Sequence, residues 1–388
     1  MKTVARMTAA VFLILIFGFS IAFWILPDRA FSDRENRGLQ TLPRFSFSKL
    51  VSGTFSEEVN NYFADQMPLR ETLIYWKGCA ERTLGKGENN GILFGNNGHL
   101  ARRKFDIILS DGGVFEDSDV FDADQIVSAC RGIQRVSERL PRFSVLLTGR
   151  NLDVVASEFD YPTDRSDALL QAVRSELSGV DRIETVSLLR DRHETGEQVY
   201  YKTDHHWTTR GAYYAYCETM RAFGQEDQIV AEACFQKETV SNTFRGSLWS
   251  AGGMPRVAAD TVEIWTLGDE AEYLVTADGR ETDGFYEWKR LAGRDHYAVF
   301  LDGTHDVVTV TRRTGEKRPT LLLVKDSFAN SLAPFLARHY DLVLLNLSSS
   351  RKDFTSVTEQ AERYGADRVL LVYTLENLLT ADKLGRLK

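Results

Sequence analysis

The chain has no excess of basic residues. Its 388 residues include 47 Lys and Arg against 55 Asp and Glu, which gives a formal net charge of −8, and the basic residues are scattered. Because binding to nucleic-acid phosphates requires a basic face, this composition argues against nucleic acid as a partner. No internal repeat or low-complexity segment is visible, and the hydrophobic content of 43% is typical of a globular protein.

Cysteine is scarce and irregularly spaced. None of the cysteines has a CxxC or other ligand-like spacing, so the sequence gives no indication of a cysteine-based metal site. A disulfide is permitted outside the membrane but is not required. We expect each of the four to be a small buried apolar side chain: Cys79, Cys130, Cys217 and Cys234.

Charged residues are absent from residues 7–26. Lys2 and Arg6 precede this apolar run, which has about the 20 residues that a helix needs to cross a bilayer. Acidic residues follow from Asp28 onward, so the positive-inside rule places the N-terminus in the cytoplasm and the bulk of the chain outside. We therefore expect a single-pass membrane anchor within residues 1–27.

A cleaved signal peptide is the alternative interpretation of this run. Its apolar region should be shorter and should end in a small-x-small cleavage site, whereas residues 23–27 read FWILP. The length of the run and this ending favour an uncleaved anchor, which predicts a cell-membrane protein with an extracytoplasmic globular part.

The rest of the chain divides into a stalk and a globular domain. Residues 28–55 are polar, which is typical of a stalk. From residue 56 to residue 84 apolar residues recur at helical spacing, and Pro68 is expected to divide this stretch into two helices. Residues 91–100 read as a β-hairpin, because Asn97-Gly98 is a strong turn signal.

Beyond the hairpin, strands and helices alternate as in a parallel sheet with crossover helices. The predicted strands cover residues 143–147, 182–187, 320–324, 342–347 and 368–373, and the predicted helices cover residues 124–140, 166–177, 209–223, 328–339 and 355–364. Residues 235–318 break this rhythm with β-like runs at 261–265, 297–301 and 306–311. We expect an α/β domain over residues 56–388 that carries a β-rich insertion at about 235–318.

The most informative stretch runs from Tyr200 to Thr208 and contains Asp204, His205 and His206 in succession. On extended backbone, Asp204 and His206 would point the same way and His205 elsewhere, because side chains alternate with a period of two. A carboxylate beside an imidazole is the orienter-and-base half of a nucleophilic hydrolase or transferase site. We therefore predict His206 as a general base and Asp204 as its orienter.

The nucleophile that this pair requires is Ser327, which follows the strand predicted at 320–324 and precedes a predicted helix. Ligands of open α/β sheets bind beyond the carboxyl ends of the strands, and a helix N-terminus supplies unpaired N–H groups that hold an oxyanion. The alternative is that Ser327 only caps the helix, a position where Ser is common. The separate Asp-His pair favours the nucleophile.

A metal site is the competing interpretation of the same stretch, because Asp and His are good ligands for zinc or iron. A third ligand would have to come from His193, His296, His305 or a distant carboxylate, and none of these lies in a recognisable metal motif. The missing ligand favours a serine mechanism without a metal or cofactor.

Four further residues could bind the oxyanion or the substrate. Trp207 could stack on a sugar ring, although aromatic residues at a sheet end are more often part of the core. Arg245 and Gly246 could approach the site and donate backbone N–H groups, with loop packing as an equally simple account. Asn330, one turn into the predicted helix, could help to bind an oxyanion or could only pack against the sheet.

These residues resemble the signature of the DHHW family. The match consists of Lys-Thr-Asp-His-His-Trp at 202–207, Glu-Asn-Arg at 35–37, Asp-Gln-Met-Pro-Leu-Arg at 65–70 and Lys-Asp-Ser-Phe-Ala-Asn at 325–330, with Pro-Phe-Leu at 334–336. That family is similar to the alginate O-acetyltransferases, which implies a three-layer, circularly permuted SGNH-hydrolase-like fold. The resemblance also implies Ser327 as the nucleophile, His206 as the base and Asp204 as the orienter.

Two departures limit what the resemblance implies. Lys325 stands where the corresponding SGNH block has a glycine, and no carbohydrate-binding module follows the catalytic region. The resemblance therefore supports acyl chemistry more firmly than it supports alginate or any other named polymer.

Together these features predict a membrane-anchored O-acyltransferase that acts on hydroxyls of a cell-surface or secreted polysaccharide through an acyl-enzyme. The resemblance further implies a membrane-bound acyltransferase partner that delivers acetyl groups across the bilayer. A carbohydrate esterase would use the same three residues with water as the acceptor. A non-catalytic polysaccharide-assembly or scaffold protein would keep the fold without turnover. The sequence separates transferase from esterase poorly, because the difference lies in water exclusion.

Overall fold

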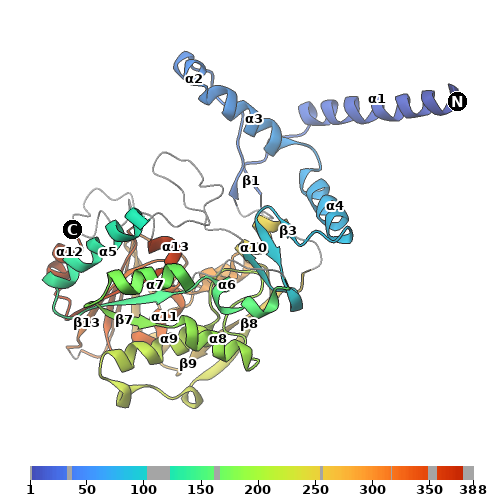
Figure 1. Ribbon diagram of the computed structural model, residues 1–388. Helices are drawn as coiled ribbons and strands as arrows, with labels where there is room; N and C mark the ends of the chain where they lie inside the picture. Colours follow the sequence, from blue (N-terminus) through green and yellow to red (C-terminus); the bar gives the residue numbers. More distant parts are fainter. Residues whose placement is uncertain are drawn as a thin grey trace. The chain divides into compact units, whose positions relative to one another are not determined.

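The computed structural model describes residues 2–32, 37–102, 123–160, 167–253, 257–315, 317–347 and 356–378 (Figure 1). The chain divides into two compact units. The first comprises Met1–Asn90 with Ser250–Arg256, and the second comprises Gly91–Trp249 with Val257–Lys388. Two residues of the family signature, Glu35 and Asn36, lie outside the described residues.

The first unit begins with helix α1 (Lys2–Ile25), which is long and apolar enough to cross a membrane. Its length and composition are consistent with either an anchor or a signal sequence. The helices that follow are α2 (Phe47–Val51), α3 (Thr54–Gln66) and α4 (Arg70–Thr83). Helical structure is interrupted around Pro68, between the end of α3 and the start of α4, as the sequence predicts.

Two blocks of the family signature meet in this first unit. The guanidinium of Arg37 donates hydrogen bonds to both carboxylate oxygens of Asp65, and the N–H of Gln40 donates to Oδ2 of the same carboxylate at 2.9 Å. The hydrogen bond from Arg37 outweighs burial, so the pKa of Asp65 is held below its usual value. Residues 37–40 are therefore held against α3 by a charge-assisted contact.

The second unit is built on an eight-stranded mixed sheet with the order β11-β10-β12-β14-β13-β15-β6-β7. Its strands are β6 (Phe143–Thr148), β7 (Asp181–Glu184), β10 (Tyr273–Ala277), β11 (Arg280–Asp283), β12 (Val307–Arg312), β13 (Thr320–Lys325), β14 (Asp341–Leu345) and β15 (Arg368–Thr374). The five strands from β14 to β7 are parallel, and the other three add to them in antiparallel fashion.

Helices cover both faces of this sheet (Figure 1). On β13, Leu321 and Leu323 pack with α9 (Thr209–Ala222) and α11 (Ala329–Leu336). The alternate residues of β13 pack on the opposite face with α5 (Ala123–Arg139), α7 (Asp167–Glu176) and α12 (Val357–Arg363). The fold is a three-layer α/β arrangement in which the apolar runs of the central strands are buried on both sides.

Smaller elements complete the described part of the chain. They are β1 (Phe31–Ser32), β2 (Arg37–Gly38), β3 (Glu88–Asn89), β4 (Ile92–Phe94), β5 (Leu100–Arg102), α6 (Asn151–Val154), α8 (Val186–Glu194), β8 (Gln236–Phe244), α10 (Ser247–Gly252), β9 (Asp260–Thr266) and α13 (Leu375–Leu378). Strands β4 and β5 form the hairpin predicted at 91–100, and Asn97 and Gly98 adopt the left-handed conformation at its turn.

Several local predictions are wrong. The run at 297–301 is not a strand, because the 3-10 helix η7 covers His296–Val299. The strand predicted at 182–187 ends at Glu184, and helix α8 begins two residues later. The four cysteines are free thiols; Cys130 and Cys217 are buried as predicted, whereas Cys79 is only partly buried and Cys234 is exposed.

Candidate active site

Ser327 lies in the turn between β13 and α11, at the carboxyl end of a central strand. The carboxylate of Asp326 holds this turn, since it accepts hydrogen bonds from the N–H groups of Phe328 at 3.1 Å and Thr374 at 2.8 Å. The N-cap of α11 is Phe328, and Ser327 does not cap the helix. Ser327 is partly exposed.

Ser327, His206 and Asp204 form a continuous hydrogen-bonded row. Nε2 of His206 lies 2.6 Å from Oγ of Ser327, and Nδ1 of the same ring lies 2.5 Å from Oδ1 of Asp204. His206 and Asp204 are buried, whereas the serine is accessible. The arrangement couples a hydroxyl to an imidazole and the imidazole to a carboxylate, which is the geometry of an activated nucleophile.

The backbone that brings Asp204 and His206 together is not extended. Tyr200 pairs with Trp207 as an isolated bridge, and the N–H of Tyr201 donates to the carbonyl of His206 at 3.1 Å. The intervening residues form a bent loop, so the alternation assumed from the sequence is wrong. The two side chains converge because the loop folds back and lets the N–H of His206 donate to Asp204 Oδ1 at 3.0 Å.

His205 is not directed away from the site, contrary to the prediction. Its ring lies against that of His206, with centroids 3.8 Å apart, and its Nδ1 lies 2.6 Å from Oγ of Ser247. Its side chain is 44% exposed, so it forms part of the outer wall of the site.

The pKa of Asp204 is set by opposing effects. Burial raises it, but both adjacent histidines and the N–H of Ser247, 2.8 Å from Oδ2, together hold it well below its usual range. Gly246 makes this approach possible, since a Cβ at that position would lie 2.2 Å from the Asp204 carboxylate. The carboxylate therefore stays ionised beside the imidazole.

Asp260 on β9 supports the loop from behind. Its carboxylate accepts hydrogen bonds from the N–H of Lys202 at 2.8 Å, and from the N–H and the hydroxyl of Thr203 at 2.8 and 2.6 Å. Burial is the largest effect on this carboxylate and raises its pKa. Asp260 thus fixes the two residues that precede Asp204, and no local motif in the sequence indicates it.

Tyr297 is a second residue that the sequence does not indicate. Its ring stacks on that of His206 with an interplanar angle of 10°, and its hydroxyl donates to the carbonyl of Ser327 at 3.0 Å. The same hydroxyl lies 3.0 Å from Oγ of Ser331. Burial raises the pKa of Tyr297, so the hydroxyl remains protonated. Tyr297 therefore contacts both His206 and Ser327.

Two of the residues considered for oxyanion or substrate binding are buried instead. Trp207 is fully buried, and its indole N–H donates to Oγ of Ser331 at 2.9 Å. Asn330 is 1% exposed; its Oδ1 accepts from Nζ of Lys325 at 2.7 Å, and its Nδ2 donates to the carbonyl of Gly303 at 2.9 Å. Both side chains have internal partners, which is the packing alternative that the sequence left open for each of them.

Arg245 and Gly246, the other two residues considered for oxyanion or substrate binding, make different contacts. The N–H of Gly246 donates to Oγ1 of Thr203 at 3.1 Å, so its contribution is close packing against Asp204 rather than an oxyanion contact. Arg245 is partly buried, donates to the carbonyl of Val257 at 3.3 Å and lies over the ring of Trp249. Arg245 does not join the hydrogen-bonded row.

Lys325, the last residue of β13, is buried two positions before Ser327, with 1% of its surface exposed. Burial lowers its pKa to about 8, although the carboxylates of Asp326 and Asp278 act in the opposite direction. Its ammonium group donates a hydrogen bond to Oδ1 of Asn330 at 2.7 Å. Lys325 therefore connects the end of β13 to the first turn of α11.

Asp204, His205 and His206 offer three ligand atoms within 4.8 Å of one another, which is a possible metal set. Both nitrogens of His206 are already hydrogen bonded, however, so an ion would have to displace Ser327 or Asp204 from the ring. The other histidines considered as ligands face elsewhere: His193 contacts Glu158, His296 contacts Ser241, and His305 contacts Asp278. The arrangement favours a serine nucleophile over a metal.

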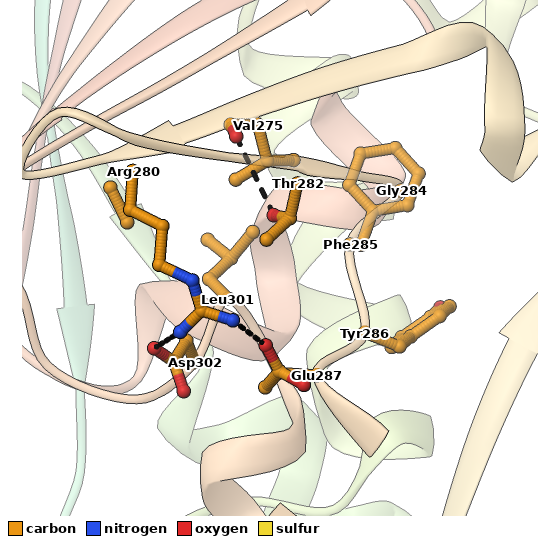
Figure 2. A pocket seen from close by; sticks show the side chains of 10 residues that line it. Val275, Arg280, Thr282, Gly284, Phe285, Tyr286, Glu287, Leu301 and Asp302 are labelled. Carbon is orange, nitrogen blue, oxygen red and sulfur yellow. Dashed lines mark hydrogen bonds and ion pairs between the residues drawn. The ribbon is translucent and has the colours of Figure 1, made fainter. Parts of the chain in front are cut away.

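A cavity lies at the antiparallel edge of the sheet, between β10, β11 and the segment before β12 (Figure 2). Apolar side chains such as Phe285 and Leu301 line it together with charged ones. The guanidinium of Arg280 points between the carboxylates of Glu287 and Asp302 and bonds to both. The charged side chains that line the cavity therefore pair with one another. Asp204, His206 and Ser327 are not among the residues that line it.

Comparison with known proteins identifies the fold. Residues 151–264 match the family model described as SGNH hydrolase-like domain, acetyltransferase AlgX. PatB1 of Bacillus cereus, in a structure with a sulfonyl adduct, is similar at 20% sequence identity and a TM-score of 0.59, over 76% of this chain and 100% of that chain. A DHHW family protein from Eubacterium siraeum is similar at 17% identity and a TM-score of 0.54, over 76% and 97% of the two chains.

A second PatB1 structure gives a TM-score of 0.58 at 19% identity, over 74% of this chain and 96% of that one. Among curated protein sequences, none matches the chain significantly. These findings confirm the predicted SGNH-hydrolase-like α/β fold and the predicted resemblance to DHHW and AlgX-type proteins.

Proposed function

We propose that the protein is a membrane-anchored, extracytoplasmic O-acyltransferase that acts on polysaccharide hydroxyls through an acyl-enzyme on Ser327. The observation that carries this proposal is the row in which Nε2 of His206 lies 2.6 Å from Oγ of Ser327 and Nδ1 lies 2.5 Å from Asp204. The match of residues 151–264 to a family model described as an acetyltransferase supports the same reaction class.

In the proposed first half-reaction, Oγ of Ser327 attacks the carbonyl carbon of an acyl donor and Nε2 of His206 takes the serine proton. The tetrahedral intermediate collapses when His206 returns that proton to the leaving group, which leaves an ester on Ser327. The N–H of Ser327 makes no hydrogen bond within the described residues, so it is available to stabilise the oxyanion. Asp204 holds the imidazole tautomer and stabilises the imidazolium.

In the second half-reaction a sugar hydroxyl takes the place of the leaving group. His206 removes its proton, the hydroxyl oxygen attacks the acyl carbonyl, and Ser327 Oγ leaves with the proton that His206 returns. A carbohydrate esterase would follow the same route with water as the acceptor. A scaffold protein in polysaccharide assembly would retain the fold without turnover.

The membrane part of the proposal depends on α1. An anchor would keep the catalytic unit near a membrane-bound acyltransferase partner that supplies acetyl groups from the cytoplasmic side. We expect the mature protein to keep its N-terminus and to stay with membranes after high-salt and carbonate washing. A soluble form that begins shortly after Leu26 would show instead that the segment is a cleaved signal.

The nucleophile is tested with the full chain in detergent, an activated acetyl ester as donor and a soluble oligosaccharide as acceptor. Ser327→Ala should lower kcat by roughly three orders of magnitude or more. Ser356→Ala is a matched control, because it removes the cap of α12 and costs about 1 kcal/mol of stability without touching the site.

The products distinguish the proposed activities. O-acetylated sugar identifies a transferase, whereas free acetate alone identifies an esterase. A folded Ser327→Ala variant with undiminished turnover would end the nucleophile proposal. Inactivity of the parent protein toward both acceptors would favour the scaffold.

A further inference from the structure

A second cluster of polar side chains lies outside the hydrogen-bonded row. It consists of His99 at the turn before β5, Glu158 at the end of the 3-10 helix η2 (Ala156–Glu158), and His193 in the last turn of α8. The three residues come from separate segments, and 94 positions separate the first from the last. The side chain of His99 is buried, with 4% exposed, and those of His193 and Glu158 are partly buried, with 9% and 16% exposed.

The three side chains face one another. Oε1 of Glu158 lies 3.2 Å from Nε2 of His193 and 3.9 Å from Nε2 of His99, and the cluster offers three ligand atoms within 4.8 Å of one another. Zinc binds His nitrogen and carboxylate oxygen at about 2.0–2.2 Å, so tetrahedral ligands lie roughly 3.3–3.5 Å apart. The cluster reaches that spacing with side-chain shifts of about 1 Å, which rotamer adjustment can supply.

A neighbouring side chain orients the carboxylate of the cluster. Asn97 donates to Oε2 of Glu158 at 3.0 Å, which fixes the carboxylate and leaves Oε1 facing both histidines. Nδ1 of His99 is buried and has no hydrogen-bond partner in the described part of the chain.

We propose that His99, Glu158 and His193 bind one divalent transition-metal ion, with zinc as the preferred ion. Two imidazoles and one carboxylate form a ligand set typical of zinc, and water would complete the coordination. The ion would join the β4–β5 hairpin, the η2 segment and α8. No role in acyl transfer is assigned to it.

The position of this cluster gives the ion a structural consequence. The N–H of Leu100, next to His99, donates to the carbonyl of Lys202 at 2.8 Å, and Nζ of Lys202 donates to the carbonyl of Asn97 at 3.0 Å. These two hydrogen bonds hold the hairpin against Lys202, which lies two positions before Asp204. A bound ion would stabilise the base of the loop that carries the catalytic Asp-His pair.

The test uses the full chain in detergent, stripped with a chelator and then titrated with Zn²⁺ alone. We expect one ion per chain by calorimetry, and a rise in Tm of about 5 °C when free Zn²⁺ is a hundredfold above its Kd. Co²⁺ should give visible absorption bands from a nitrogen and oxygen ligand set. None of these readouts depends on turnover.

Variants locate the ion. Glu158→Gln keeps the side-chain volume and the contact with Asn97, and should lose the Tm rise while keeping the Tm measured in chelator. His193→Ala should lose the same stoichiometric ion, whereas His305→Ala is the matched histidine control and should keep it. Absence of stoichiometric binding in the parent chain would overturn the proposal. Binding that survives Glu158→Gln and His193→Ala but is lost in His205→Ala would place the metal at Asp204-His205-His206 and would also overturn it.

Discussion

The ring of Tyr297 lies parallel to the imidazole of His206, with centroids 3.8 Å apart, while its hydroxyl donates to the carbonyl of Ser327. One buried side chain therefore touches both partners of the proposed proton transfer. The stack limits rotation of the imidazole, and the hydroxyl fixes the backbone of the turn that carries Ser327. Proton transfer depends on this alignment, because small misplacements of reacting groups reduce rates strongly.

The first prediction separates these two contacts of Tyr297. Tyr297→Phe keeps the stack but removes the hydroxyl, so we expect kcat to fall roughly tenfold and stability to fall by about 1–2 kcal/mol. Tyr297→Ala also removes the ring and should lower kcat further. Tyr286→Phe is the control, since it loses a buried hydrogen bond to Trp265 and should keep kcat. Equal kcat values for the parent and for both Tyr297 variants would contradict a positioning role.

The second prediction concerns the two adjacent histidines. His206→Ala should lower kcat by roughly three orders of magnitude or more, because the serine loses its base. His205→Ala should have a much smaller effect, since its Nδ1 meets Ser247 rather than Ser327. Asp204→Asn should also be costly, because the amide no longer selects the productive imidazole tautomer.

The measurement for these variants is kcat and KM on an activated acetyl ester, with circular dichroism to verify folding. The losses should appear in kcat, because the groups act chiefly in the transition state. Equal losses for His205→Ala and His206→Ala would argue against the assigned base.

The third prediction follows from the buried ammonium group of Lys325. Its pKa is about 8 in the folded chain against an ordinary value of 10.5, so at pH 7.5 the protonated form destabilises the fold by about 3 kcal/mol. Between pH 8 and 10.5 the unfolded chain binds a proton that the folded chain does not, so stability rises with pH. Lys325→Met lacks this dependence.

The comparison is made by urea denaturation of both proteins at pH 7.5 and pH 10. We expect the parent to gain about 2 kcal/mol relative to Lys325→Met between these values. The difference isolates Lys325, because tyrosine, cysteine and other lysine residues titrate alike in the two chains. If the difference in unfolding free energy between the two proteins does not change with pH, burial does not lower the pKa of Lys325.

The sequence predicts the central strands because burial on both faces leaves a signature in the chain. β13 and β15 are continuous apolar runs, and the structure places both in the middle of the sheet. β10 and β11 carry mixed polar and apolar residues, and the pairing of β10 with β12 joins distant segments that no local pattern reveals. The run at 297–301 has strand-like composition, yet it forms a 3-10 helix whose Tyr297 packs on His206.

The candidate site likewise contains residues that the sequence predicts and residues that only the folded chain reveals. Asp204 and His206 are recognisable because they stand two positions apart, and Ser327 because a turn follows an apolar strand. Tyr297 and Asp260 act on these residues from positions with no motif around them, so only the folded chain brings them into view. Trp207 and Asn330 lie within the same motifs, but their side chains are buried and hydrogen bond with Ser331 and Lys325, respectively.

The last prediction distinguishes the serine mechanism from a metal held by Asp204, His205 and His206. The experiment uses His193→Ala, in which the proposed zinc cluster is already removed, so any remaining metal dependence must come from another site. We expect exhaustive chelation to leave the turnover of this variant unchanged, and added Zn²⁺ to have no stimulating effect. The physical reason is that both nitrogens of His206 are occupied by Ser327 and Asp204 in the resting site. Activity that disappears with chelator and returns with zinc would replace the serine mechanism with a metal one.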